Sequence, residues 1–176
     1  SPRPVVCMLT RILVDAHDPA LTRPTKPIGP FYSEARARAE AEVNGWVIKE
    51  DAGRGWRRVI GSPKPLAVLE LDSIRALFET GTVVVAAGGG GIPVARGPGG
   101  AYVGVEAVID KDRASVLLAG LLDIETLVII TGVTHVAVNF GKRTQRNLDR
   151  ITAAEARAFY DAGEFGEGSM KPKMEA

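Results

Sequence analysis

A continuous apolar run, Thr82–Ala87, leads directly into four glycines, Gly88–Gly91, and this combination fits few folds. The run is rich in β-branched valine and has no alternating polar residues, which is the pattern of a strand covered on both faces. Glycines placed directly after a strand let the backbone turn sharply and approach a ligand closely. The sequence therefore predicts an α/β fold with a ligand-sized turn at a strand end.

The order of elements after residue 70 supports this interpretation. Helical patterns at 72–81, 112–122 and 152–163 surround a second apolar run, Thr126–Thr131, which we expect to be another buried strand. Asp72 is the expected N-cap of the first of these helices, and the capping-box residues Thr152–Glu155 open the last. Helices that alternate with strands predict a three-layer α/β/α sandwich with a mostly parallel sheet.

The segment 15–62 interrupts this pattern. Asp15–Phe31 contains four prolines and is expected to be a loop, a polar helix is predicted at 34–43, and 46–48 and 56–60 resemble the strands of a hairpin. We therefore expect a single domain over 1–176, incomplete at both ends, in which 15–62 forms a small protruding lobe.

The composition narrows the class of protein. The chain has 22 basic and 21 acidic residues, and this near balance gives no overall field that would attract nucleic acid or an anionic membrane. No apolar run is long enough to cross a bilayer. Cys7 is the only cysteine; we expect it to be a small buried hydrophobic residue, and it fits a reducing compartment such as the cytoplasm. His17 and His135 have no partner spacing, so no metal site is expected.

The glycine run is the first candidate site. Successive backbone N–H groups in such a turn can form a concave anion site, and Gly88, Gly89, Gly90 and Gly91 are therefore candidates for phosphate or substrate binding. The alternative is a flexible tight turn without a ligand. The run lacks the spacing of a dinucleotide fingerprint or a P-loop, because Ile92–Pro93 follows it.

Three lysines are the next candidates. Lys111 lies between two aspartates where a helix begins, so Lys111 could reach a phosphoryl group and Asp112 could orient it; a charged helix entry is the alternative. Lys173 follows Ser169–Met170 in a first helical turn, where an anion is favoured, unless this is a solvated basic turn. Prolines on both sides would hold Lys26 stiffly, although an ordinary solvent-exposed lysine is the default.

Several blocks together resemble the carbamate kinases of the amino-acid kinase superfamily. In chain order they are Pro24–Tyr32, Gly88–Pro93, Gly104–Asp112, Val138–Lys142 and Gly168–Lys173. The resemblance spans nearly the whole chain and implies reversible phosphoryl transfer between ATP and carbamate, giving ADP and carbamoyl phosphate, with Mg as cofactor and a homodimer. Such enzymes serve arginine or allantoin-type catabolism in the cytoplasm.

The resemblance also implies roles for individual residues. Lys111 and Lys173 would contact the transferring phosphoryl group and the nucleotide phosphates in one shared pocket, and Asp112 would hold these lysines in place. Lys26 would close over the site from the protruding lobe, with Gly88–Gly91 near the phosphates. The nucleotide would also lie near Met170 and near Thr131, Gly132 and Val133, the last three at the adenine.

The sequence departs from the family at its ends. The family's first strand with its Gly-Gly-Asn loop is missing, as are the last helix and strands, so we expect these 176 residues alone to be inactive. Two alternatives stay open: a related kinase that phosphorylates a carboxylate or a nucleoside monophosphate, and a non-catalytic nucleotide-binding module.

Overall fold

The computed structural model of the chain describes residues 2–51, 53–166 and 170–176. These residues form two compact units, 1–123 and 124–176, and each is described by itself. The expectation of one domain over 1–176 with a lobe at 15–62 stays a prediction.

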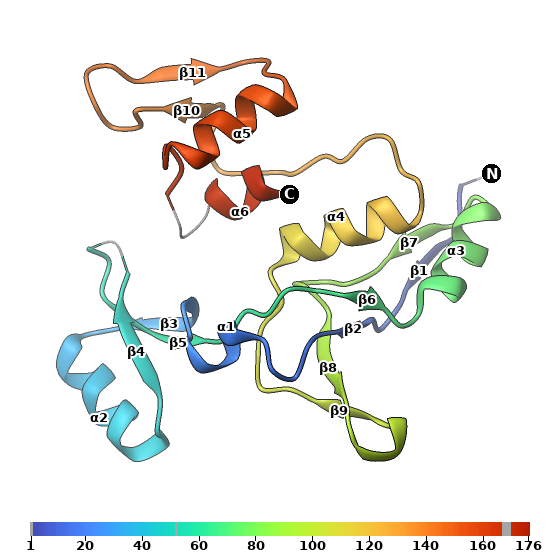
Figure 1. The fold of residues 1–176 in the computed structure, drawn as a ribbon, viewed down its shortest axis with the longest axis horizontal. Helices are drawn as coiled ribbons and strands as arrows, with labels where there is room; N and C mark the ends of the chain where they lie inside the picture. Colours follow the sequence, from blue (N-terminus) through green and yellow to red (C-terminus); the bar gives the residue numbers. More distant parts are fainter. Residues whose placement is uncertain (1, 52, 167–169) are drawn as a thin grey trace. The chain divides into compact units, whose positions relative to one another are not determined.

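The first unit alternates short strands and helices (Figure 1). The elements outside the lobe are β1 (Val5–Cys7), β2 (Arg11–Leu13), β6 (Ala67–Val68), α3 (Leu71–Glu79), β7 (Val83–Val85), β8 (Ile92–Arg96), the short 3₁₀ helix η1 (Pro98–Gly100), β9 (Tyr102–Gly104) and α4 (Lys111–Leu121). Strands β1 and β7 pair in parallel, and so do β2 and β8. Strands β6 and β9 add antiparallel edges in the order β6-β2-β8-β9. The predicted α/β class is confirmed.

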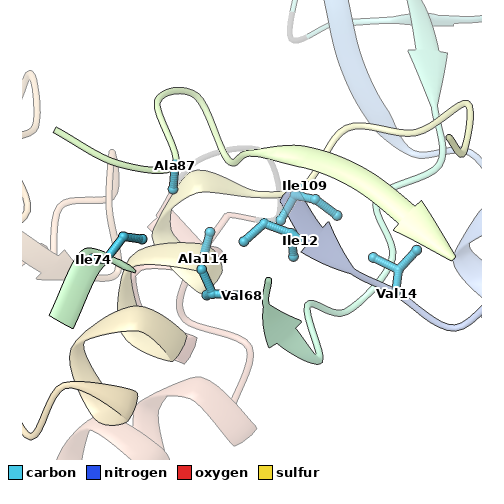
Figure 2. Close-up of a cluster of buried hydrophobic side chains, with 7 residues drawn as sticks. All are labelled: Ile12, Val14, Val68, Ile74, Ala87, Ile109 and Ala114. Carbon is cyan, nitrogen blue, oxygen red and sulfur yellow. The ribbon is translucent and has the colours of Figure 1, made fainter. Parts of the chain in front are cut away.

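A buried apolar cluster joins these strands to α3 and α4 (Figure 2). Ile12 of β2 and Ala114 of α4 are fully buried, and Ile109 is 1% exposed. Figure 2 shows Ile12 beside Ile109, at the point where the chain enters α4. This packing fixes the start of α4 against the strand layer.

The strands β1 and β7 correct one expectation. Val83 and Val85 are 44% and 48% exposed, and Cys7, which pairs with Val85, is exposed as well. The predictions that Thr82–Ala87 is covered on both faces and that Cys7 is buried are therefore wrong for this chain. The physical reason is that this two-stranded sheet packs on one face: Val84 lies against the buried cluster, whereas Val83 and Val85 point to the other, exposed face.

Helix α3 differs from the prediction at its first residue. Its N-cap is Glu70, and Asp72 lies in the first turn, where its charge favours the helix dipole. The Glu70 carboxylate accepts hydrogen bonds from the backbone N–H and Nε of Arg11, at 2.7 and 2.6 Å. The N-cap thus lies two residues before the predicted one, at a residue whose side chain contacts a strand that is distant in the sequence.

The lobe segment combines a three-stranded antiparallel sheet with a short helix and a longer one. Its elements are α1 (Pro19–Thr22), β3 (Lys26–Tyr32), α2 (Glu34–Asn44), β4 (Val47–Glu50) and β5 (Trp56–Ile60), with β5 in the centre of the sheet. Helix α2 ends at Gly45, whose φ of 66° is typical of a C-terminal glycine. The loop predicted over Asp15–Phe31 is wrong for 19–22, which form α1, and for 26–31, which belong to the edge strand β3. An edge strand tolerates proline because the missing N–H need not take part in the ladder.

The second unit contains β10 (Val136–Val138), β11 (Arg146–Leu148), α5 (Ala153–Asp161) and α6 (Met170–Glu175). Strands β10 and β11 form an antiparallel hairpin, and α5 begins with the predicted capping box. The strand expected at Thr126–Thr131 is wrong: the segment is irregular, and Val128 and Ile130 are 72% and 86% exposed. A strand needs a neighbour for its backbone groups, and this segment pairs with no strand among the described residues.

Candidate active site

The site begins at the first turn of α4. Asp110 is the N-cap, and its Oδ1 accepts hydrogen bonds from the backbone N–H groups of Asp112 and Arg113 at 2.9 and 3.3 Å. Asp110 and Asp112 are 3% and 5% exposed, whereas Lys111 between them is exposed. The helix start therefore has a buried acid cap and an exposed lysine, an arrangement that both the phosphoryl-contacting role of Lys111 and the alternative of a charged helix entry would show.

Lys26 reaches this helix start from the lobe. Its Nζ donates a hydrogen bond to Asp110 Oδ2 in an ion pair whose side chains are 26% and 5% exposed. Lys26 is the first residue of β3, opposite Ile60 of β5. It is therefore not an ordinary solvent lysine, because a strand fixes its backbone and a buried carboxylate holds its ammonium group.

The ion pair determines the charge state of Asp110. Burial alone would raise the pKa of Asp110, because it disfavours the charged carboxylate. The hydrogen bond and charge of Lys26, helped by the two α4 amides, outweigh burial, and the net result is a pKa below the ordinary value. Asp110 is therefore ionised at neutral pH and faces an ammonium group.

The glycine loop lies against the same helix start. Gly90 has a φ of 138°, and a Cβ at this position would lie 2.1 Å from the backbone oxygen of Ile109. Two of the loop amides are engaged inside the turn: Gly88 donates to Ala86 O at 2.8 Å and Gly90 to Ala87 O at 2.7 Å. The turn is thus built by its own hydrogen bonds, and its role as an anion cradle stays a prediction.

Thr10 bonds the residues on either side of the glycine loop in the sequence. Its Oγ1 accepts the backbone N–H of Ala87 at 2.9 Å, and its backbone oxygen accepts the N–H of Ile92 at 2.8 Å. A Cβ on Gly91 would lie 2.4 Å from Ile12 Cγ1, so this end of the loop also has no spare room. Both ends of the loop are therefore held by Thr10 and by Ile12 of β2.

The structure brings together part of the predicted site. Lys26, Gly88–Gly91, Lys111 and Asp112 all belong to the first unit and surround the start of α4. Sequence reasoning did not include Asp110 among the site residues, although an aspartate directly before a helical pattern is a recognisable N-cap. It also missed Thr10, for which the sequence holds no signal.

The other predicted residues belong to the second unit. Lys173 lies in α6, which begins at Met170, while Gly168 and Ser169 fall outside the described residues. Thr131, Gly132 and Val133 are exposed. Their roles, and the pocket shared by Lys111 and Lys173, stay predictions.

Other chemistry has little support in the described residues. His17 is exposed, and His135 Nε2 lies 3.0 Å from Asp149 Oδ1 in a surface pair. Within residues 2–51, 53–166 and 170–176, no three histidine, cysteine or acidic side chains gather as a metal site would require. None of the helices there is both long and apolar enough to cross a membrane.

The fold and this site define an α/β domain with a candidate ligand site beyond the carboxyl end of a parallel strand, β7. The model of the amino acid kinase family matches residues 27–176, and the chain belongs to that family.

Individual relatives agree with this assignment. The chain is 48% identical over 174 residues to the carbamate kinase-like protein YqeA of Escherichia coli, covering 99% of this chain and 56% of the relative. It is 49% identical over 172 residues to carbamate kinase 1 of Enterococcus faecium, covering 98% and 54%. The chain thus spans about half the length of the curated relatives that it matches.

Solved structures support the same family assignment. The carbamate kinase of Giardia lamblia bound to citric acid superposes with a TM-score of 0.91 at 41% identity, over 99% of this chain and 55% of that one. The same enzyme bound to AMP-PNP gives a TM-score of 0.83 at 41% identity, with the same coverage. The predicted amino-acid kinase fold and the resemblance on which it was based are confirmed.

Proposed function

We propose that this chain is part of a carbamate kinase that catalyses reversible phosphoryl transfer between ATP and carbamate. The observation that supports this most directly is the meeting of Lys26, the glycine loop and the start of α4 at one place. These are three of the segments on which the resemblance to carbamate kinases rests. The relatives named carbamate kinase share nearly half of their residues with this chain over the aligned length.

Phosphoryl transfer requires cations held in fixed positions. In phosphoryl transfer the charge spreads over the oxygens of the transferring group, and fixed positive groups supply most of the stabilisation. Lys111 is exposed at the first turn of α4, where the helix dipole also favours an anion. We propose that Lys111, Lys26 and Lys173 contact the phosphoryl group and the nucleotide phosphates, and that Asp112 orients the lysines.

The nucleotide would bind in the manner that the family suggests. Gly88–Gly91 would lie beside its phosphates, Met170 would also lie near the nucleotide, and Thr131–Val133 would lie near the adenine. A solved relative holds AMP-PNP, which supports ATP or ADP as the nucleotide here. Mg²⁺ would be bound largely through phosphate oxygens and water, its usual ligands at such sites. We also propose a cytoplasmic homodimer that acts in arginine or related catabolism.

The test is an ATP-forming assay with carbamoyl phosphate and ADP on the protein from its complete reading frame. The expected result is ATP formation when carbamoyl phosphate is the phosphoryl donor, and none when an acyl phosphate or a nucleoside diphosphate is the donor. Preference for an acyl phosphate or for a nucleoside substrate would assign the chain to another branch of the family. We expect the 176 residues alone to be inactive, and turnover at ordinary enzyme rates would refute that.

A second measurement separates a kinase from a nucleotide-sensing module. Lys111→Ala should lower kcat much more than it weakens nucleotide binding, because a cation that acts on the transition state contributes little to the ground state. Equal losses in rate and in affinity would favour the sensor.

A further inference from the structure

We infer that Asp110 is a positioning residue, whose carboxylate sets where the Lys26 ammonium group stands relative to the first turn of α4. The inference rests on the proposed function and deepens it, because it names the group that holds a lysine of the phosphoryl site in place. Asp110 does not need to touch the substrate for this role.

The two oxygens of Asp110 serve two different elements. Oδ1 accepts the N–H groups of Asp112 and Arg113, and Oδ2 accepts Lys26 Nζ. One carboxylate therefore ties a lobe strand to the helix start, across 84 positions of the sequence. Because the helix amides fix the carboxylate, the carboxylate in turn fixes the ammonium group.

A second ion pair joins the same two segments and offers a comparison. Lys26 lies opposite Ile60, and Arg58 lies two residues earlier on β5, so both side chains leave the same face of the lobe sheet. Arg58 Nη2 lies 2.5 Å from Glu106 Oε1, and Val108 N–H donates to Gly61 O at 3.0 Å. The segment before α4 thus receives two cations from the lobe.

The two pairs differ in burial, and burial decides which of them matters. The Glu106 side chain is 79% exposed, so water can replace Arg58 with little loss. The Asp110 side chain is 5% exposed, so loss of either partner leaves an uncompensated charge that water reaches poorly. Lys26 without its carboxylate would regain the rotamers of a long flexible side chain.

A purely structural role for Asp110 as a helix cap is the competing explanation. Asparagine caps helices as well as aspartate does. Asp110→Asn therefore keeps the cap at Oδ1 and removes the charge that holds Lys26. A loss of activity in this variant, without a loss of folding, would come from the ion pair.

The experiment is a double-mutant cycle on the full-length protein with Asp110→Asn, Lys26→Met and the combination, and with Glu106→Gln as the exposed control. We expect Asp110→Asn to lower kcat/KM for carbamoyl phosphate at least 10-fold, mostly in kcat, in a protein that stays folded at the assay temperature although its melting temperature falls. The combined variant should be no worse than Lys26→Met alone, since Asp110 acts through Lys26. Glu106→Gln should change kcat/KM less than 2-fold, and Asp110→Glu should recover part of the loss.

Wild-type turnover in Asp110→Asn would overturn the inference. It would also be overturned if the fold loss in kcat/KM of the combined variant equalled the product of the losses from Asp110→Asn and Lys26→Met. A readout that does not depend on activity separates this inference from the proposed function. In spectra of lysine side chains labelled with ¹³C and ¹⁵N, Asp110→Asn should shift the Lys26 signals and Glu106→Gln should not. If the wild type lacks carbamate kinase activity, the proposed function fails, and the Lys26 signals still decide the role of Asp110: unchanged signals would refute it.

Discussion

Gly90→Ala tests whether the glycine loop is fixed by contact with the chain that enters α4. The new Cβ would lie 2.1 Å from Ile109 O and 2.8 Å from Ile109 C, both backbone atoms that no side-chain rotation can move away. The φ of 138° is in addition a region that residues other than glycine rarely adopt.

The magnitude follows from these two terms. A backbone conformation that only glycine accepts costs a residue with a side chain about 1–3 kcal/mol. Overpacking that forces a backbone shift costs about another 1–3 kcal/mol. We therefore expect the free energy of unfolding to fall by roughly 2–6 kcal/mol, a large share of the ~5–15 kcal/mol typical of a domain.

Two neighbouring glycines separate the contributions. An added Cβ at Gly89 meets no atom within 4 Å and the residue has no positive φ, so Gly89→Ala should change stability by about 0.5 kcal/mol or less. Gly88 has a φ of 45° with open space around it, so Gly88→Ala should show only the conformational cost, about 1–2 kcal/mol.

The assay is urea unfolding followed by far-ultraviolet circular dichroism, with the midpoint and slope compared among the three variants. A slope that stays constant while the midpoint falls reports a change in stability. Equal midpoints for Gly90→Ala and Gly89→Ala would refute the argument that the loop is packed against Ile109.

Three further predictions concern residues that hold the site or the fold. Thr10→Val keeps the shape of a residue that is 3% exposed but leaves the Ala87 N–H without its acceptor. We expect the free energy of unfolding, measured with urea, to fall by about 1–3 kcal/mol. Thr22→Val, at an exposed hydroxyl, is the control and should have little effect. The lowered pKa of Asp110 predicts a contribution to the free energy of unfolding that is present above the unfolded-state pKa of about 3.9 and is lost as pH falls through the lower folded-state pKa. Asp110→Asn should remove this part of the acid dependence of unfolding. Identical acid-unfolding profiles for wild type and variant would contradict it. Thr152→Ala removes the hydroxyl that accepts the Glu155 N–H at 3.2 Å; amide hydrogen exchange should become faster in the first turn of α5, with a local loss of about 1 kcal/mol, and unchanged exchange there would count against the capping box.

Elements whose causes are local could be predicted from the amino-acid sequence. Ser33 and Gly45 bound α2 because a hydroxyl can cap the first turn and glycine can adopt the left-handed conformation that ends the helix. The capping box at Thr152 placed α5 for the same kind of reason. The glycine run marked the turn after β7, because few other residues tolerate its backbone angles.

The tertiary structure decided what depends on partners distant in the chain. Lys26 and Asp110 were both visible in the sequence, but only the pairing of β3 with β5 and the packing of Ile109 bring them together. Thr126–Thr131 and Cys7 show the converse, because an apolar run becomes a strand or a core only when another segment covers it. Local propensity is set within a few residues, whereas pairing and burial depend on the whole topology, and the candidate site is made of such pairings.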